Sequence, residues 1–560
     1  MNRAVLGINA YSHDAGAALI VDGRLVFASS EERFTRIKHT PVFPSRAIRA
    51  ALHHAGLEPG DLDAVAFPWR RDMARVRKAL YVLRRLPRSL AFLRERQEGL
   101  SPRLEFLRGV AGLADDLKEI GIVAPVHHID HHLAHAVQAH RFGPADNAAL
   151  LTVDGMGEWT AAAIWQAAGD RPTLLRSRSF PHSVGKFYSA ITQHLGFRPE
   201  SGEGKTMGLA PYGRDRLVDA MRTILQPDAE RLYRVDLDAF DYPWGRARMT
   251  GDAFAEQFGP ARGPHDPLEA GHQDLAFAAQ VVLEEVMLEV ARRLREETGA
   301  KHLGLAGGTF LNCVLNARLR DEAGFATQFV FPAAGDAGAA AGAAAWVARM
   351  PRTELTNVYL GEAFGAGRID QALEGRRFEI AGDPADVAAE ALAKGQLVGW
   401  FSGRMEFGPR ALGARSILAD ARDPEVHDRL NRTVKFREDF RPLAPAALLH
   451  KAAEWFEGVT PSPFMLETFQ VREKFRQRIP SVVHVDGSAR VQTVAEGDGH
   501  PAFLRLLERF EARTGVPLVV NTSFNVRGEP IVRTPEEALD LFERTALDLL
   551  VIEDRVLTKR

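Results

Sequence analysis

Residues 148–165, AALLTVDGMGEWTAAAIW, contain the pattern that decides the fold. An apolar run ends at Val153, a polar turn with two glycines follows, and a second apolar run completes the segment. Two such runs around a glycine turn predict a strand–turn–strand unit. Residues 4–21, AVLGINAYSHDAGAALIV, repeat the pattern, and a turn at Asp22 then leads into a further apolar run over 25–28. The recurrence predicts a duplicated α/β core.

The remainder of the chain alternates helix and strand patterns in two blocks. In the first block, a helical pattern over 270–298 precedes two apolar runs, 303–306 and 329–332, that each lead through a glycine turn into a helix. A segment rich in Pro, Thr, Asn and Gly follows at 350–367 and is typical of a linker. Beyond it, the predicted strands are 397–401, 518–521 and 549–552, and the predicted helices are 501–514 and 535–544. We therefore predict two α/β domains, 1–350 and 365–560.

The composition is that of an ordinary globular enzyme. The 560 residues are 46% hydrophobic and 26% charged, with a formal net charge of −2, so bulk charge favours neither nucleic acid nor an anionic membrane. Cys313 is the single cysteine, which excludes an intrachain disulfide. No signal peptide or long apolar run is present, so we expect a cytoplasmic protein. The arginine-rich helical pattern over 70–120 favours a solvated insertion.

A histidine cluster, HHIDHHLAH over 127–135, is the densest chemical signal. If a helix follows Asp130, His131 and His135 are four residues apart and project from one face. Asp154 and Asp336 each stand where an apolar strand meets a glycine turn, the sheet edge at which ligands bind. Two imidazoles and two carboxylates suit Fe(II), Mn(II) or Zn(II).

The histidine register stays open at this point, because His128 and His132 have the same spacing. Any single histidine here is more simply explained as a surface or capping group. The cluster together with two turn aspartates favours a metal site. A zinc-protease assignment is weak because the general-base glutamate of the His-Glu-x-x-His motif is missing.

Several turns could bind anions. In the first domain, Gly307, Gly308 and Asn312 lie between a strand and a helix, where free backbone N–H groups suit a phosphate, although the spacing matches no standard nucleotide motif. In the second domain, cationic and amide side chains occur beside Gly, Pro and Asn turns, and these favour a phosphate pocket over separate surface ion pairs. They are Arg410, Lys435, Arg441, Arg490, Asn521 and Ser523.

These motifs, in this order, resemble the nodulation/cephem/tobramycin O-carbamoyltransferase family over nearly the whole chain. The matching stretches of the first domain are GINAYSHDAGAAL, EERFTRIKHT, DHHLAHA, TVDGMGE, GKTMGLAPYG, LAGGTFLNCVLN and PAAGDAGAAAGAA. Those of the second are GRMEFGPRALGARSILAD, LNRTVKFREDFRPLAP, RVQTV and NTSFNVRGEPIVRTPEEAL.

The resemblance implies a duplicated actin/Hsp70-like (Kae1-like) N-terminal domain and a YrdC-like C-terminal domain that makes carbamoyl adenylate. It implies that His131, His135, Asp154 and Asp336 hold a metal, usually iron. His13 would be the catalytic base and Lys38 would contact the adenylate. The implied ligands of ATP and carbamoyl phosphate are Arg410, Lys435, Arg441, Arg490 and Ser523.

The expected reaction joins carbamate to the α-phosphate of ATP, which enters with Mg²⁺, and then carbamoylates a hydroxyl. The implied acceptors are sugars, antibiotics or oligosaccharides, as in natural-product tailoring. We expect no nucleic-acid or membrane partner, and a homodimer stays an open alternative to a monomer. The closest rival function is tRNA threonylcarbamoyladenosine-type modification, which the lack of a basic tail disfavours. A sugar kinase or chaperone-like ATPase would need neither the histidine cluster nor the second domain, and the polar groups at strand ends count against a non-catalytic scaffold.

Overall fold

The computed structural model describes residues 3–72, 74–90, 103–169 and 171–559. The chain divides into two compact units. The first unit comprises residues 1–26 and 41–354, and the second comprises residues 27–40 and 355–560. The sequence analysis placed 27–40 in the first domain, whereas the structure groups this segment with the second unit.

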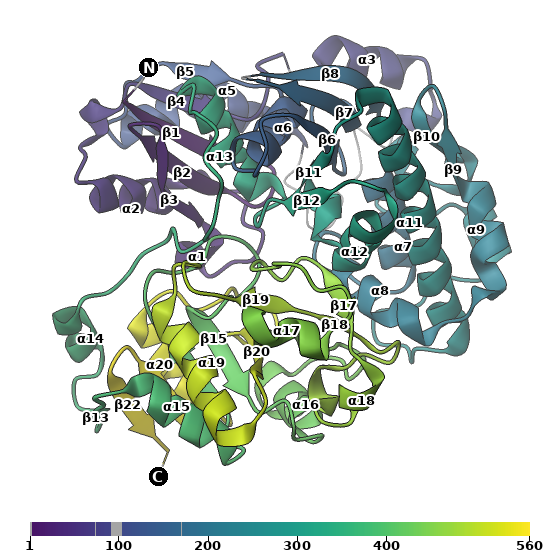
Figure 1. The fold of residues 1–560 in the computed structure, drawn as a ribbon. Helices are drawn as coiled ribbons and strands as arrows, with labels where there is room; N and C mark the ends of the chain where they lie inside the picture. Colours follow the sequence, from purple (N-terminus) through teal and green to yellow (C-terminus); the bar gives the residue numbers. More distant parts are fainter. Residues whose placement is uncertain (1–2, 73, 91–102, 170, 560) are drawn as a thin grey trace. The chain divides into compact units, whose positions relative to one another are not determined.

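Two five-stranded sheets with one topology form the first unit (Figure 1). The strand order is β3-β2-β1-β4-β5 in one sheet and β8-β7-β6-β11-β12 in the other. In each sheet the central strand, β1 or β6, is antiparallel to the next strand of the chain and parallel to the later one. The predicted duplication is therefore visible in the strand order. The strands are β1 Ala4–Asn9, β2 Gly16–Val21, β3 Arg24–Ser30, β4 Ala64–Phe67, β5 Val126–His128, β6 Ala148–Val153, β7 Thr160–Ala168, β8 Arg171–Ser179, β11 His302–Ala306 and β12 Thr327–Val330.

Helices of the first unit cover these sheets and form a helical layer of their own. The long helix α11 (Ala270–Thr298) packs against α7 (Val184–His194), α8 (Glu203–Leu209), α9 (Val218–Ile224) and α12 (Cys313–Glu322), on the side of the unit that Figure 1 draws in teal. Helices α3 (Arg75–Leu83) and α5 (Arg103–Glu119) lie within the arginine-rich stretch that was predicted to be helical. Residues 91–102 of that stretch lie outside the described residues.

Helix α13 (Asp336–Val347) packs directly on β1, β2 and helix α6 (His131–Arg141). Its Ala- and Gly-rich sequence permits backbone contact on both sides. A Cβ atom at Gly7 of β1 would lie 2.0 Å from the Ala340 carbonyl oxygen, and one at Gly342 would lie 2.0 Å from that of Ala134. Only glycine fits at such separations.

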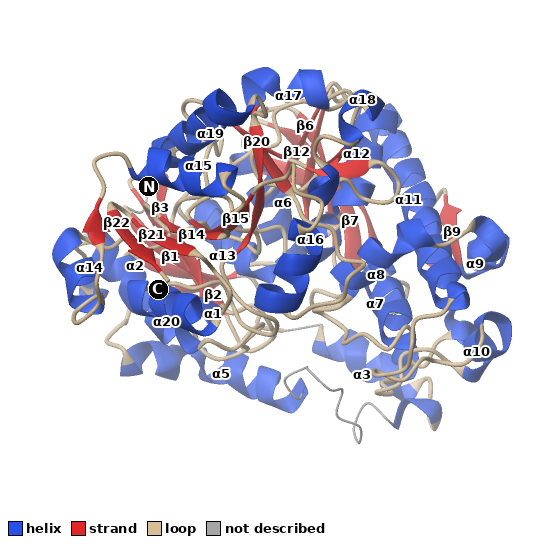
Figure 2. Ribbon diagram, turned by 90° about the horizontal axis from the view of Figure 1, so that it is seen from below, coloured by secondary structure: helices blue, strands red, loops and turns tan. Residues whose placement is uncertain are grey.

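The second unit is built on a mixed eight-stranded sheet in the order β13-β22-β21-β14-β15-β20-β16-β19. Its apolar core includes Trp400, Phe401 and Phe510. Helices α15 (Pro384–Ala393) and α19 (Pro501–Thr514) lie side by side, as both ribbon views show (Figure 1, Figure 2). The remaining bounds are β13 Glu379–Ile380, β14 Val398–Phe401, β15 Arg415–Ala419, β16 Pro445–Leu448, β19 Gln492–Val494, β20 Leu518–Ser523, β21 Leu549–Ile552, β22 Arg555–Thr558 and α20 Pro535–Arg544. The mixed α/β class predicted for this block is confirmed.

The contact between α13 and α6 gives the first prediction. Gly342→Ala should lower the free energy of unfolding by about 1–3 kcal/mol, because the added methyl group forces the two helices apart. The matched control is Gly271→Ala in α11, where a Cβ atom meets nothing within 4 Å. There the better helix propensity of alanine should leave stability unchanged or raise it by up to about 1 kcal/mol. Denaturant unfolding measures both, and equal effects of the two variants would contradict the packing argument.

Candidate functional site

Helix α6 carries the two histidines at the centre of the first unit. Asp130 caps this helix by accepting a hydrogen bond from the Leu133 N–H at 3.0 Å. His131 and His135 are both fully buried one turn apart. Because Nδ1 of His131 faces the Pro68 carbonyl at 3.3 Å, Nδ1 carries the proton and Nε2 keeps its lone pair.

The same tautomer follows for the second histidine. His135 Nδ1 lies 2.9 Å from Gln138 Oε1, whose amide nitrogen donates to the Ala333 carbonyl at 2.8 Å. The amide orientation therefore fixes Oε1 as an acceptor. Outer hydrogen bonds of this kind orient metal-binding imidazoles in proteins.

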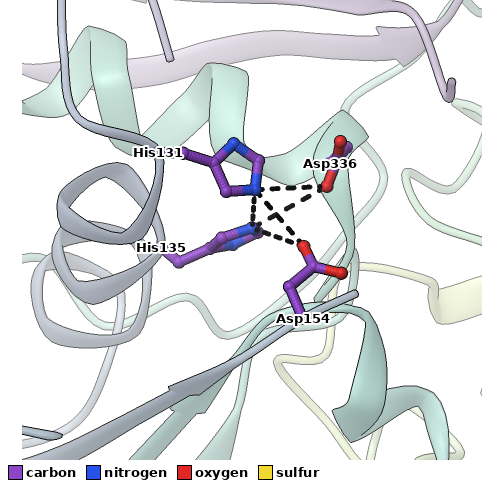
Figure 3. A group of neighbouring side chains, drawn as sticks. All are labelled: His131, His135, Asp154 and Asp336. Atoms are coloured by element: carbon purple, nitrogen blue, oxygen red, sulfur yellow. Dashed lines mark hydrogen bonds and ion pairs between the residues drawn. The ribbon is translucent and has the colours of Figure 1, made fainter. Parts of the chain in front are cut away.

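Two aspartates complete the group (Figure 3). Asp154 follows β6, and its Oδ2 lies 3.3 Å from His131 Nε2 and 3.4 Å from His135 Nε2. Asp336 begins α13, and its Oδ1 lies 3.5 and 3.9 Å from the same two nitrogens. The two Nε2 atoms are 3.2 Å apart, and all four ligand atoms lie within 4.8 Å of one another. The structure thus brings together the four residues predicted to bind metal.

The charge distribution of this group favours a cation at its centre. Two carboxylates converge on two imidazoles at a buried point, where electrostatic interactions are strong, so that positive charge is stabilised there. Burial by itself lowers the pKa of His131, but Asp336 and Asp154 outweigh it and hold that pKa well above its usual value. Burial by itself raises the pKa of Asp154, but His131 and His135 outweigh it and hold that pKa well below its usual range. Two nitrogen and two oxygen donors fit a first-row divalent metal.

His128 and His132, the alternative pair, point elsewhere. His132 bonds through Nδ1 to Thr152 Oγ1 at 2.9 Å and through Nε2 to the Thr160 carbonyl at 3.0 Å. Burial and the neighbouring imidazoles lower the pKa of His132 to about 3. His128 Nδ1 faces the Trp69 carbonyl at 2.9 Å. The register that the sequence left open is therefore His131 with His135.

His13 lies beside this centre, on the loop between β1 and β2. Its Nε2 is 3.8 Å from Oδ2 of Asp336, and its Nδ1 is 2.9 Å from Asp14. Asn9 holds the loop by donating to the carbonyls of His13 at 3.0 Å and Asp14 at 3.1 Å. Burial lowers the pKa of His13, but the adjacent carboxylates outweigh it and raise that pKa well above its usual value.

The glycine turn after β11 contacts the same centre. A Cβ atom at Gly307 (φ 105°) would lie 2.2 Å from the Val153 carbonyl, and one at Gly308 would lie 3.3 Å from Asp154 Oδ1. Asn312 caps α12 by accepting from Leu315 N at 3.0 Å. The glycines thus let the turn approach Asp154. The Asn312 side chain is engaged in capping α12. Nucleotide binding by these three residues stays a prediction.

Lys435 is a buried cation of the second unit. Its Nζ donates to Ser523 Oγ at 3.1 Å, and to the side chain and carbonyl of Asn525 at 2.8 and 3.0 Å, at the carboxyl end of β20. Burial, then Arg437, Lys38 and Arg441, hold the pKa of Lys435 well below its usual value.

Further arginines surround Lys435. Burial, Arg441 and Arg490 lower the pKa of Arg437 to about 9. Burial, and then Arg490 and Arg527, lower the pKa of Arg441, although Glu438 opposes this shift. Glu438 lies 3.9 Å from Arg441 and 3.3 Å from Arg527. Cations that depress one another's pKa values in a buried setting favour a polyanionic ligand.

Segment 27–40 brings Lys38 into this cluster. Arg33 donates to the Gly408 carbonyl at 2.9 Å, and Arg36 donates to the carbonyls of Ile531 and Pro530 at 2.7 and 2.8 Å. Burial lowers the pKa of Lys38, and Arg441 adds to this shift. Lys38 therefore lies close to Arg441 and Lys435, in the cation cluster of the second unit.

Asn521 and Arg410 occupy neighbouring parts of this unit. Asn521 is buried and donates to Gln492 Oε1 at 2.7 Å and to the Ala411 carbonyl at 3.3 Å, while Gln492 donates to the Leu412 carbonyl at 2.8 Å. The amides of Asn521 and Gln492 thus fix the turn that carries Arg410. Sequence reasoning did not select Arg527, although it follows the predicted residue Ser523 by four positions.

Comparison with known proteins identifies the family of the chain. Residues 4–345 match the family description "Carbamoyltransferase N-terminus", and residues 389–559 match "Carbamoyltransferase C-terminus". The chain belongs to the carbamoyltransferase family.

Relatives of this carbamoyltransferase align over most of its length. An uncharacterized protein of Synechocystis sp., sll1178, is 41% identical over 99% of the chain and 96% of its own length. Nodulation protein NolNO of Sinorhizobium fredii is 36% identical over 99% of the chain and 80% of its own length. Nodulation protein U of Sinorhizobium fredii is 31% identical and covers 92% and 93% of the two chains.

Among solved structures, HypF of T. kodakarensis gives a TM-score of 0.33 at 14% identity, covering 62% of this chain and 48% of its own. Component A of the Acidaminococcus fermentans (R)-2-hydroxyglutaryl-CoA dehydratase also gives 0.33, at 13% identity, covering 61% of this chain and 96% of its own. Within the described residues, no helix of the carbamoyltransferase is both long enough and apolar enough to span a bilayer.

The four converging ligands predict metal binding. Elemental analysis of the purified carbamoyltransferase should find about one first-row transition metal per chain, because the group offers one mixed N/O site. His135→Ala should lower this occupancy by removing a ligand. His132→Ala serves as the matched control, because its ring bonds to Thr152 and Thr160 instead. Loss of metal in His132→Ala with retention in His135→Ala would contradict the assignment.

Proposed function

We propose that this carbamoyltransferase is ATP-dependent and catalyses two steps. It forms carbamoyl adenylate from carbamoyl phosphate and ATP, and it then transfers the carbamoyl group to a hydroxyl. The observation that supports this best is the presence of two unlike sites. One is a buried group of histidines and aspartates beside His13, and the other is a cluster of cations around Lys435.

The first step suits the cation cluster. Water releases carbamate and orthophosphate from carbamoyl phosphate. A carbamate oxygen then attacks the α-phosphate of ATP, so that carbamoyl adenylate forms and pyrophosphate leaves. Both substrates are strongly anionic, and Mg²⁺ would accompany ATP. Arg441, Arg490 and Lys38 would offset this charge, which relieves the mutual repulsion that depresses their neighbours' pKa values.

The second step suits the first unit. His131, His135, Asp154 and Asp336 would hold Fe(II) or another first-row metal, which supplies Lewis-acid polarisation of a carbonyl when bound. A metal on Asp336 would offset the carboxylate charge that raises the pKa of His13, so that His13 could accept the proton of the acceptor hydroxyl as its oxygen bonds to the carbamoyl carbon. The bond from that carbon to the phosphate oxygen breaks, and AMP leaves.

The acceptor we propose is a small molecule or a saccharide, as in natural-product tailoring. Two of the relatives are named as nodulation proteins. The equal strand order of the two sheets supports an actin/Hsp70-like duplication of the first unit. A YrdC-like second unit is proposed on its mixed sheet and cation cluster. Modification of tRNA is the alternative, and the near-neutral net charge of −2 disfavours it.

The cation cluster predicts when pyrophosphate is released. The purified enzyme should release pyrophosphate from ATP only when carbamoyl phosphate is present. Arg441→Ala and Lys435→Ala should abolish this release, because each removes a charge that the anions need. Arg432→Ala is the matched control, since its exposed side chain pairs with Asp428 at 3.5 Å and Asp439 at 3.8 Å. Formation of ADP in place of pyrophosphate and AMP would rule out the adenylate route.

The position of His13 predicts that the two steps can be separated. His13→Asn should form carbamoyl adenylate at the normal rate, while transfer falls by roughly 100- to 10,000-fold, the usual contribution of a general base. Lys38→Ala should instead reduce pyrophosphate release. Both activities are measured on one preparation with an acceptor that the wild type uses. Equal loss of both activities in His13→Asn would show that this residue supports the fold or the first step.

A further inference from the structure

The loop that carries His13 has an unfavourable backbone conformation. Tyr11 has φ 70° and Asp14 has φ 53°, in the left-handed region that non-glycine residues rarely adopt. An aromatic residue is especially uncommon there. Such a conformation persists only where surrounding contacts hold it in place. Contacts of the Tyr11 side chain must therefore hold this backbone conformation.

Helix α5 supplies the closest of these contacts. The Tyr11 hydroxyl donates a hydrogen bond to the Asp116 carboxylate. The Tyr11 ring lies so close to Gly109 that a Cβ atom there would be 2.4 Å from two ring carbons. On its other side, the ring stacks with Phe43, at 6.5 Å between centroids and 21° between planes. Tyr11 is thus enclosed between α5 and the segment that follows residue 40.

A second set of contacts runs from α5 to the metal ligands. Phe106 of α5 packs edge-on against Trp69 at 5.1 Å between ring centroids. Trp69 lies over the His131 ring at 4.2 Å, and its indole nitrogen donates to Asn9 Oδ1 at 3.0 Å. Asn9 in turn holds the carbonyl of His13. Both sets of contacts end at the same site.

We propose that α5 is a positioning element for carbamoyl transfer, and that Tyr11 and Asp116 are the positioning residues through which it fixes the His13 loop. This inference rests on the proposed role of His13. It assigns a task to helix α5, which lies in the arginine-rich stretch whose sequence indicated only a solvated insertion. Tyr11 acts through the loop backbone, because its hydroxyl is engaged with Asp116.

The sharpest test uses two glycines of the same helix. In Gly109→Ala, the added methyl group must displace the Tyr11 ring, whereas in Gly112→Ala it meets nothing within 4 Å. Both changes improve helix propensity, so neither weakens α5 itself. Gly109→Ala should lower the kcat of transfer by about 100-fold, the effect of misplacing a reacting group by about 1 Å. Pyrophosphate release should stay at the wild-type rate in both variants, and Gly112→Ala should transfer normally.

The hydrogen bond is tested by a double-mutant cycle. Tyr11→Phe and Asp116→Ala should each reduce transfer, and the double variant should be no worse than the more damaging single variant, because both remove one interaction. Additive losses would show that the two residues act separately and would overturn the proposed route.

A readout that does not depend on turnover completes the experiment. The rate at which diethyl pyrocarbonate modifies His13, measured by peptide mass spectrometry, should change in Gly109→Ala and stay as in the wild type in Gly112→Ala. An unchanged rate together with full transfer in Gly109→Ala would overturn the inference, as would equal loss of transfer and pyrophosphate release. A wild type that formed no carbamoylated product would contradict the proposed function instead, and the modification rates would still test the position of His13.

Discussion

The backbone contact between α13 and α6 is the constraint on which the first unit depends. Asp336 is the first residue of α13, and His131 is the first residue of α6. Gly342 lets α13 approach the Ala134 carbonyl, and a Cβ atom at Gly338 would lie 2.0 Å from the Ala333 carbonyl and 2.2 Å from the Gln138 amide. Gln138 also orients His135. The spacing of the candidate metal ligands is therefore set by helix packing, because a longer interhelical distance would separate a carboxylate on one helix from the imidazoles on the other.

The candidate sites of the two units have opposite charge preferences. In the first unit, buried carboxylates stabilise positive charge on the neighbouring imidazoles, and a metal cation could take the place of that charge. In the second unit, the buried Lys435 lies among half-buried arginines, so that binding an anion relieves the repulsion between these cations. Each arrangement costs folding free energy until a ligand offsets it, and a ligand that binds only the folded state stabilises that state. A metal bound in the first unit and a phosphate compound bound in the second would therefore each stabilise the folded state separately.

The sequence predicted what local patterns encode and missed what long-range backbone contacts decide. The strands around 4–28 and 148–165 follow from apolar runs and turn residues, and a pair of histidines on one helix face follows from their four-residue spacing. Segment 27–40 could not be placed, because Arg33 and Arg36 bond to backbone carbonyls, and these acceptors have no residue signature. Choosing His135 over His132 required knowing which helix face meets β6 and which meets α13. His13 was selected through the family resemblance, since Asp14 alone would explain a turn histidine.

Lys435 and Arg441 make unlike contributions within one cluster, and their geometry shows why. The Lys435 ammonium has three N–H donors, and four oxygen atoms of Ser523 and Asn525 already lie within hydrogen-bond distance. Its charge therefore acts on an anion mainly through the field at the end of β20, and its removal would also leave those oxygens without their donor. Arg441 is about one-third exposed and lies at 3.9 Å from Glu438, a weak pairing that a phosphate could replace with a bidentate contact. The buried lysine thus fixes the end of the strand and the local potential, whereas the arginine presents the exchangeable donors.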